Sequence, residues 1–246
     1  MAVTPEALSE LYPHLFHMAE LGSWNNIKRD GLLSTSALLD LYKVSKEERI
    51  EIETKRRPES RTIADANLGS ARIRDQKPLH ESKLQTSLTD CTILDWHRML
   101  NSRVFFWLHQ DRLKTLLGAR EYREKPHDVI TADTLSMATA HQNSITLSPM
   151  NSGNTVPFAW ERGLSTFRRM AEYPFEERLK RGPYYTVVEL AVDRGVPDIK
   201  KYTQRVDVLC YATTDEVILL GTIEKAQGAP PSPFRNATPE EMRRYL

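Results

Sequence analysis

The sequence is poor in cysteine, with only Cys91 and Cys210 among its 246 residues. Two thiols cannot complete the four-ligand zinc clusters that stabilise small metal-binding domains. The first residues, "MAVTPEALSELYPHLF", lack the basic start and continuous apolar stretch of a secretory leader, so a disulfide is not expected. We therefore expect a reducing, cytoplasmic location.

Long apolar runs and an excess of charge of one sign are also missing. No stretch approaches the roughly 20 apolar residues that cross a bilayer, so we expect no membrane association. The formal net charge of +1 creates no general field that would attract nucleic acid. A nucleic-acid partner would have to be bound by a local basic patch.

The usual signatures of metal sites and hydrolases are absent too. The seven histidines are scattered, and no His-x-x-x-His, Glu-x-x-His or paired-carboxylate pattern places ligands on one helix face. There is no Gly-x-Ser-x-Gly elbow, and neither cysteine has an activating context. We therefore predict no metal site and set hydrolase functions aside.

The N-terminal segment contains clear local signals. "TPEALSELYPHLF" predicts a helix that is capped by Thr4, has Pro5 at its first position and ends near Pro13. Residues 14–18 are expected to form a short strand. The next apolar spacing, in "ELGSWNNIKRDGLL", predicts a helix closed by Gly31 in a left-handed conformation.

The middle of the chain alternates charged, polar and aromatic stretches. "TSALLDLYKVSKEERIEIETKRR" predicts helices with an exposed, charged face, whereas "RTIADANLGSARIRDQKPL" is a polar segment without an assigned structure. "RVFFWLHQ" is typical of a strand covered on both faces, and "DRLKTLLGAREY" of a helix that stops at Gly118.

The C-terminal half is predicted to be mainly β. Strands are expected in "HDVITADT", "NSITLSP", residues 184–192, "VDVLCY" and "EVILLGTIE", with a loop at "PMNSGNTVPF" and a basic helical stretch over residues 165–182. Thr238 and Glu241 predict a capping box for a last short helix. Without an internal repeat or linker, residues 1–246 are expected to form a single α+β domain.

Two polar residues in apolar strands are candidates for function. Glu189 lies between valines and leucine in "TVVELAV", where an inward-facing carboxylate needs a partner or a shifted pKa, although strand alternation could also place it in solvent. His17 follows an apolar run, where it either packs in the core or faces a ligand. Taken singly, neither residue identifies a function.

In chain order, these features resemble the ADP-ribosyltransferase fold, and specifically the DarT-type DNA ADP-ribosyltransferase family. That family has a strand with His-Ile-Thr, a helix and Gly-Leu, and here "FHMAELGSWNNIKRDGLLS" carries His17 and Gly31-Leu32. "RTIADANLGSARIR", "VFFWL" and "VVELAV" are similar to the family's arginine segment, aromatic strand and glutamate strand. This chain departs from the pattern at Met18-Ala19, which replaces Ile-Thr.

The resemblance implies split, mixed or antiparallel β-sheets with peripheral helices, and NAD as the substrate. Glu189 would stabilise the positive charge that develops on the ribose as nicotinamide leaves. Arg72 or Arg74 would pair with the diphosphate through a guanidinium fork, and the spacing also leaves Arg103 open. The residues that would bind NAD are His17, Met18, Ala19, Gly31, Leu32, Ser34, Ser36, Phe105 and Trp107.

The acceptor implied by the resemblance is a base of single-stranded DNA, with RNA as the alternative. The basic stretch over residues 161–182, in which Phe and Tyr are interleaved, is the candidate strand-binding surface. An antitoxin or a hydrolase would be the partner protein. Two alternatives remain open: an RNA 2′-phosphotransferase that also uses NAD, and an inactive nucleotide-binding or nucleic-acid-binding module of the same fold.

Overall fold

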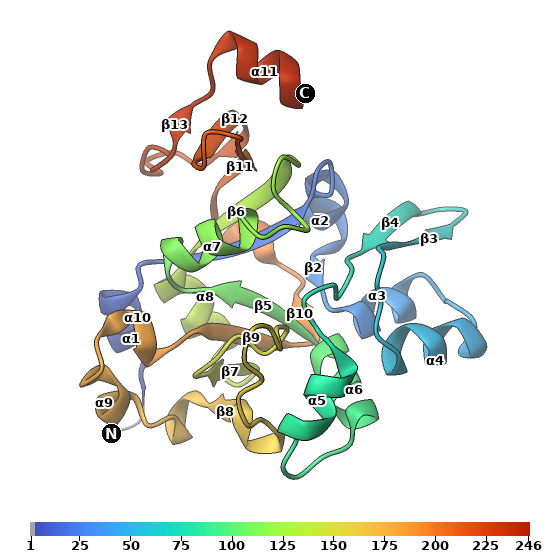
Figure 1. Ribbon diagram of the computed structural model, residues 1–246. Helices are drawn as coiled ribbons and strands as arrows, with labels where there is room; N and C mark the ends of the chain where they lie inside the picture. The colour runs from blue at the N-terminus through green and yellow to red at the C-terminus, as the bar shows by residue number, and fades with distance from the viewer. Residues whose placement is uncertain (1–2) are drawn as a thin grey trace.

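The computed structural model describes residues 3–246, which form an α+β protein around one large mixed sheet (Figure 1). The sheet has nine strands in the order β13-β12-β11-β6-β1-β5-β9-β7-β8. Its pairs are antiparallel except for β12 with β13, which run parallel. The prediction of the α+β class is therefore confirmed.

The elements have the following bounds. The helices are α1 (Pro5–Leu11), α2 (Trp24–Asp30), α3 (Thr35–Leu41), α4 (Lys46–Thr54), α5 (Glu81–Ser87), α6 (Ile93–Asn101), α7 (Gln110–Leu117), α8 (Thr134–His141), α9 (Phe175–Leu179), α10 (Pro183–Thr186) and α11 (Pro239–Tyr245). The strands are β1 (His14–Glu20), β2 (Leu32–Leu33), β3 (Arg61–Asp65), β4 (Gly69–Ile73), β5 (Arg103–Trp107), β6 (His127–Asp133), β7 (Ile145–Ser148), β8 (Arg168–Arg169), β9 (Glu189–Asp193), β10 (Gly195–Val196), β11 (Thr203–Tyr211), β12 (Val217–Lys225) and β13 (Arg235–Asn236). Residues 3–246 also contain the 3₁₀ turns η1 (Leu164–Thr166), η2 (Met170–Glu172) and η3 (Ile199–Lys201).

The large sheet is almost divided between β1 and β5. Strand β1 pairs with β6 along its whole length, whereas its pairing with β5 is limited to Phe16 opposite Trp107. On the far side of this division, β5 pairs fully with β9. Backbone pairing between the two halves of the sheet is therefore limited to one residue pair.

Alternating side chains pack the two faces of the sheet against different helices. Leu15 of β1 belongs to the main core, which also contains residues of α1 and α8. Phe16 and Met18 point to the other face, where they pack with Leu113 and Leu117 of α7. Helices on both faces thus hold β1 in place.

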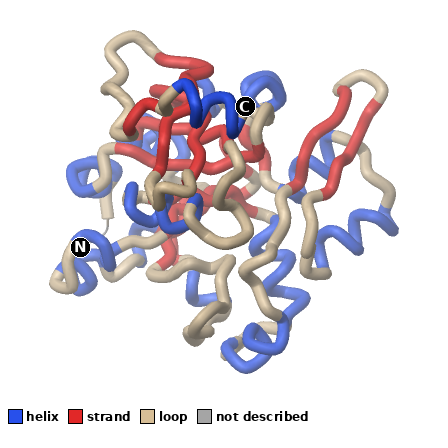
Figure 2. Tube along the Cα trace, turned by 45° about the horizontal axis from the view of Figure 1, so that its top comes forward, coloured by secondary structure: helices blue, strands red, loops and turns tan. Residues whose placement is uncertain are grey.

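A small lobe of α3, α4 and the β3–β4 hairpin has its own apolar cluster. Ile52 of α4 packs there with Ile63 and Ile73 of the hairpin. In Figures 1 and 2 the hairpin stands apart from the large sheet. The lobe therefore forms a separate wall beside the sheet.

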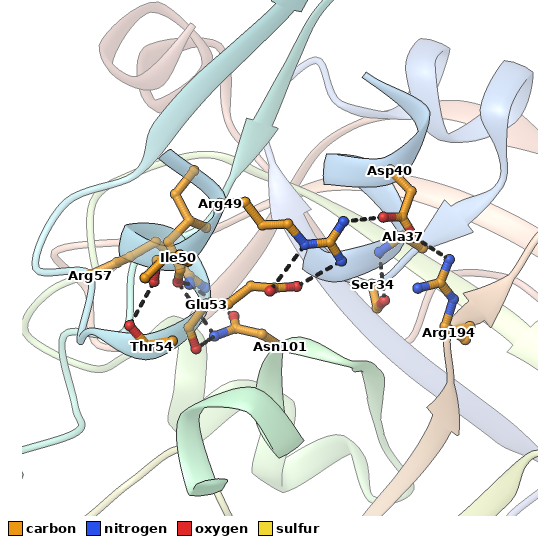
Figure 3. A network of polar contacts seen from close by, with 11 residues as sticks. Ser34, Ala37, Asp40, Arg49, Ile50, Glu53, Thr54, Arg57, Asn101 and Arg194 are labelled. Carbon is orange, nitrogen blue, oxygen red and sulfur yellow. Dashed lines mark hydrogen bonds and ion pairs between the residues drawn. The ribbon is translucent and has the colours of Figure 1, made fainter. Parts of the chain in front are cut away.

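Polar contacts fasten this lobe to the body of the protein, as Figure 3 shows. Asp40 of α3 pairs with Arg49 of α4 and with Arg194, which follows β9. Arg57 donates to the side-chain oxygen of Asn101 at 2.8 Å, which ties the end of α4 to α6. The lobe is thus anchored at its base, below the hairpin.

Most of the predicted elements are found in the structure. The helix capped by Thr4, the first strand, the helix that ends before Gly31, the stop at Gly118 and the C-terminal capping box at Thr238 are all confirmed. The strands expected at β6, β7, β11 and β12 are confirmed too. In the described part of the chain, no helix has the length and apolar character that a membrane span requires.

Four details differ from the sequence-based expectation. The polar segment forms the β3–β4 hairpin, because Ile63, Ala71 and Ile73 pack on the lobe's own cluster. Strand β9 begins only at Glu189, since Pro183 starts the short helix α10. Residues 165–182 are not one helical stretch but contain the end of the 3₁₀ turn η1, strand β8, the 3₁₀ turn η2 and one short α-helix, α9. Gly31 has φ 90° and ψ 163°, a positive φ that favours glycine but lies outside the left-handed helical conformation.

Candidate active site

A cleft of about 750 Å³ opens at the division of the sheet. Its walls come from β1, β5, α7, the β3–β4 hairpin and the loop after β7, and His17, Arg74 and Glu189 all line it. Clefts of this size are typical of sites that bind a cofactor or drug-sized ligand. The structure therefore brings the two strand-borne polar candidates to one cavity.

His17 faces the cleft from β1 with a defined ring orientation. Its Nδ1 lies 2.9 Å from the carbonyl oxygen of Phe105 on β5. Because a carbonyl only accepts, Nδ1 carries the proton and Nε2 remains an acceptor. Burial, against the hydrogen bond to Phe105 and with a smaller contribution from the charge of nearby Arg74, lowers the pKa of His17 to about 4. His17 is thus a neutral ring at physiological pH.

Glu189 is the first residue of β9 and only 4% exposed. It lies opposite Trp107 of β5 and Ser148 of β7, so strands on both sides fix its backbone. The backbone N–H of Ser152 donates to its Oε2 at 3.0 Å. Burial raises the pKa of this carboxyl to about 7, against hydrogen bonds from Ser152 and the charges of Arg112 and Arg162.

The arginines in and beside the cleft differ in what they already bind. Arg72 is exposed and its Nε donates to Glu20 at 2.8 Å, and Arg103 pairs with Asp193 at 2.9 Å. The guanidinium of Arg57 donates to backbone carbonyls and to the side chain of Asn101. These three guanidinium groups have partners within the protein.

Arg74 and Arg112 also line the cleft, but among residues 3–246 neither has a carboxylate at ion-pair distance. Arg74 donates to the carbonyl of Met18 at 2.8 Å and lies 4.8 Å from the centre of the Tyr122 ring. Arg112 donates to the carbonyl of Tyr184 at 2.7 Å and lies 4.0 Å from the centre of the Tyr184 ring. Its Nε is buried without a partner. Each cation is oriented but not neutralised.

The Gly-Leu segment forms the wall next to the small lobe. Gly31 closes α2, and Leu32 starts β2, which pairs with β10. An added Cβ at Gly31 would lie 2.5 Å from the Cα of Pro197, so only glycine fits this close approach. Ser34 caps α3 by accepting from the N–H of Ala37, and it still lines the cleft.

The cleft includes all but one of the residues expected to bind NAD or to act in catalysis. His17, Met18, Ala19, Gly31, Leu32, Ser34, Arg72, Arg74, Phe105, Trp107 and Glu189 line it. Ser36 does not, because it is buried within α3. Strand β5 is covered less completely than expected: Val104 and Phe106 are buried, whereas Phe105 and Trp107 are half-buried and face the cleft.

Several cleft residues were not found from the sequence. Arg112 and Tyr184 come from short helices, and Asn151, Ser152 and Asn154 come from the loop between β7 and β8. The loop itself was predicted from "PMNSGNTVPF", yet nothing in those letters indicates that Ser152 meets Glu189. In residues 3–246 no group of three or more metal-ligating side chains lies together.

Comparison with known proteins gives a family match. A family model described as "Family of unknown function (DUF7002)" matches residues 13–203, which include every cleft residue discussed above. No curated protein and no solved structure matches the chain.

Proposed function

The chain belongs to the DUF7002 family, and because that membership assigns no activity, we propose from the cleft that it is an NAD-dependent mono-ADP-ribosyltransferase. The observation that carries the proposal is the meeting of His17 and Glu189 in one cleft at the division of the sheet. The division supports a split-sheet fold of the ADP-ribosyltransferase type. The order of His17, Gly31, Arg74 and Glu189 along the chain supports the same fold.

Glu189 has the chemistry that this reaction needs. The bond between the nicotinamide nitrogen and the ribose carbon breaks, and nicotinamide leaves with the electron pair while positive charge develops on the ribose. A carboxylate that is buried and held by Ser152 stabilises that charge without reorganising. With its pKa raised to about 7, Glu189 also suits the uptake of the proton that the acceptor loses as it bonds to the ribose.

Arg74 is the arginine we assign to the diphosphate, in preference to Arg72 and Arg103. It lines the cleft next to His17 and has no carboxylate partner, whereas Arg72 is paired with Glu20 and Arg103 with Asp193. Phosphate oxygens would supply the countercharge that the described chain lacks there. Arg112 likewise has no carboxylate at ion-pair distance in the described chain, although its charge acts on Glu189 from the other side of the cleft.

For the acceptor we propose an unpaired nucleic-acid base, with DNA favoured over RNA. The loop that lines the cleft at Asn154 and Val156 continues into Phe158 and Trp160, which are 71% and 68% exposed. Exposed aromatic rings beside a cleft suit the stacking of unpaired bases. The basic stretch over residues 161–182 supports this role less, because Arg169 pairs with Asp193 and Arg178 donates to backbone carbonyls.

Nicotinamide release tests the proposal. The protein is incubated with NAD and with denatured DNA, RNA, 2′-phosphorylated RNA or no acceptor, and free nicotinamide is measured. We expect release with an unpaired acceptor, and Glu189→Ala should reduce the rate at least about 100-fold, because a preorganised charge at the reacting centre is lost. Glu177→Ala on the exposed face of α9 is the matched control and should retain the rate.

Two outcomes of this experiment would favour a function other than the transferase. Consumption of the 2′-phosphate would identify an RNA 2′-phosphotransferase. A complete lack of nicotinamide release with every acceptor would contradict the transferase and favour a binding module.

A further inference from the structure

Arg162 is a buried cation without a catalytic contact of its own. Its side chain lies in the loop between β7 and β8 and is not part of the cleft lining, and the residue is only 2% exposed. In the described chain it forms no ion pair with any carboxylate. Burial of an unpaired charge is costly, so its presence requires a reason.

The contacts of Arg162 connect the two arms of this loop. Its backbone is fixed to the end of α5, since its N–H donates to the carbonyl of Ser87 at 2.8 Å and its carbonyl accepts from Thr89 at 3.0 Å. Its Nη1 reaches the opposite arm and donates to the carbonyls of Ser152 at 3.1 Å and Asn154 at 3.0 Å. The side chain thus links the two arms of the loop.

Through Ser152, the side chain of Arg162 is also linked to Glu189. Ser152 accepts from Arg162 through its carbonyl and donates through its N–H to Oε2 of Glu189. The guanidinium also lies 5.7 Å from the centre of the Trp96 ring, which limits its movement. Buried cation and buried carboxylate are therefore joined by the backbone of one residue.

We propose that Arg162 is a positioning residue that holds the Ser152 N–H against Glu189 and supplies the countercharge of the Glu189 carboxylate. The charged groups that bear on Glu189 are Arg112 of α7 and Arg162. Its strand neighbours Trp107 and Ser148 carry no charge. Arg112 acts by charge alone, whereas Arg162 acts by charge and by loop geometry.

The role is tested without any assay of activity. The ionisation of Glu189 is followed by carboxyl ¹³C NMR, with the signal identified by its loss in Glu189→Gln, and amide hydrogen exchange is followed at Ser152. In Arg162→Met we expect the pKa of Glu189 to rise by at least about one pH unit and exchange at Ser152 to accelerate at least about tenfold. The exposed Arg168→Met is the matched control and should leave both values unchanged.

A second variant keeps the test decisive if Arg162→Met does not fold. Arg162→Lys retains the charge, but it is shorter and lacks the Nε group that donates to the carbonyl of Trp160 at 3.0 Å, so we expect faster exchange at Ser152 with a smaller change in the pKa of Glu189. Wild-type values for both quantities in a folded Arg162 variant would overturn the proposal. So would an equal response in Arg168→Met.

The catalytic consequence rests on the proposed function and is measured separately. In the nicotinamide-release assay, Arg162→Met should lower kcat and leave KM for NAD unchanged, because Arg162 does not line the cleft. A lack of release by the wild-type protein would end the proposed function but not the NMR result. Unchanged NMR and exchange data would end the role of Arg162 even if release occurs.

Discussion

Glu189 illustrates how a single buried carboxylate costs stability at the pH where it is useful. Its pKa is about 7 in the folded protein, chiefly because of burial, against an ordinary value of 4.5. The folded state therefore holds this proton over a range in which the unfolded state has lost it. Stability falls as pH rises from about 4.5 to about 7 and the loss is complete above that range.

Glu189→Gln should remove this cost. Glutamine has nearly the same shape, still accepts from Ser152 and does not ionise. We expect the variant to be more stable than the wild type by up to about 3 kcal/mol above pH 7, with no advantage near pH 4. Urea unfolding measured at both pH values checks this prediction. An equal difference at both would show that ionisation of Glu189 is not its source.

Residue types in unusual places explain how much of the site was predictable. His17 and Glu189 stand out in the sequence because a charged or titratable group inside an apolar strand requires a reason. Arg112, Ser152 and Arg162 give no such signal, since polar residues in helices and loops are ordinary. Their roles arise from contacts between segments far apart in the chain, such as Ser152 with Glu189.

At the scale of elements, the approach of β2 to β10 forms the wall of the cleft beside the small lobe. Gly31 precedes β2 with φ 90°, and an added Cβ would lie 2.7 Å from the carbonyl oxygen of Pro197. Gly22 has φ 81° but no atom within 4 Å of the same position. Both glycines have a positive φ, which disfavours a side chain, but only at Gly31 would neighbouring backbone atoms also clash with one.

Alanine at these two positions should separate the two effects. Gly22→Ala should cost about 1 kcal/mol through backbone strain alone. Gly31→Ala should cost at least about 2 kcal/mol more, because backbone atoms around Pro197 must move. Chemical unfolding of both variants measures the difference. Equal costs would mean that the close approach at Gly31 does not constrain the wall.

The elements also show where sequence patterns are sufficient and where they are not. Helix caps and turns, such as Thr4 and Gly118, depend on neighbouring residues and were predicted correctly. The β3–β4 hairpin was not predicted, because its three buried apolar residues are few and pack on α3 and α4 rather than on the large sheet. The sequence pattern predicts a strand over residues 184–188. Instead, Pro183 begins helix α10, and the contacts of Tyr184 with Arg112 hold Tyr184 in that helix.

For the whole molecule, the division of the sheet between β1 and β5 is the feature that makes a site. His17 comes from one half and Glu189 from the other. The hydrogen bond from His17 to the carbonyl of Phe105 spans the division. Because neither half contains both groups, only the complete fold can form the cleft.

The central claim is that this cleft holds NAD, and calorimetric titration of NAD into the Glu189→Gln protein tests it most directly, because that variant should bind without turnover. We predict saturable binding to one site. In the same background Arg74→Ala should weaken binding at least about tenfold through loss of a charge-assisted contact. Arg72→Ala, whose guanidinium is already paired with Glu20, should change it by less than about threefold. Absence of NAD binding, or equal binding by the Arg74 and Arg72 variants, would contradict the account.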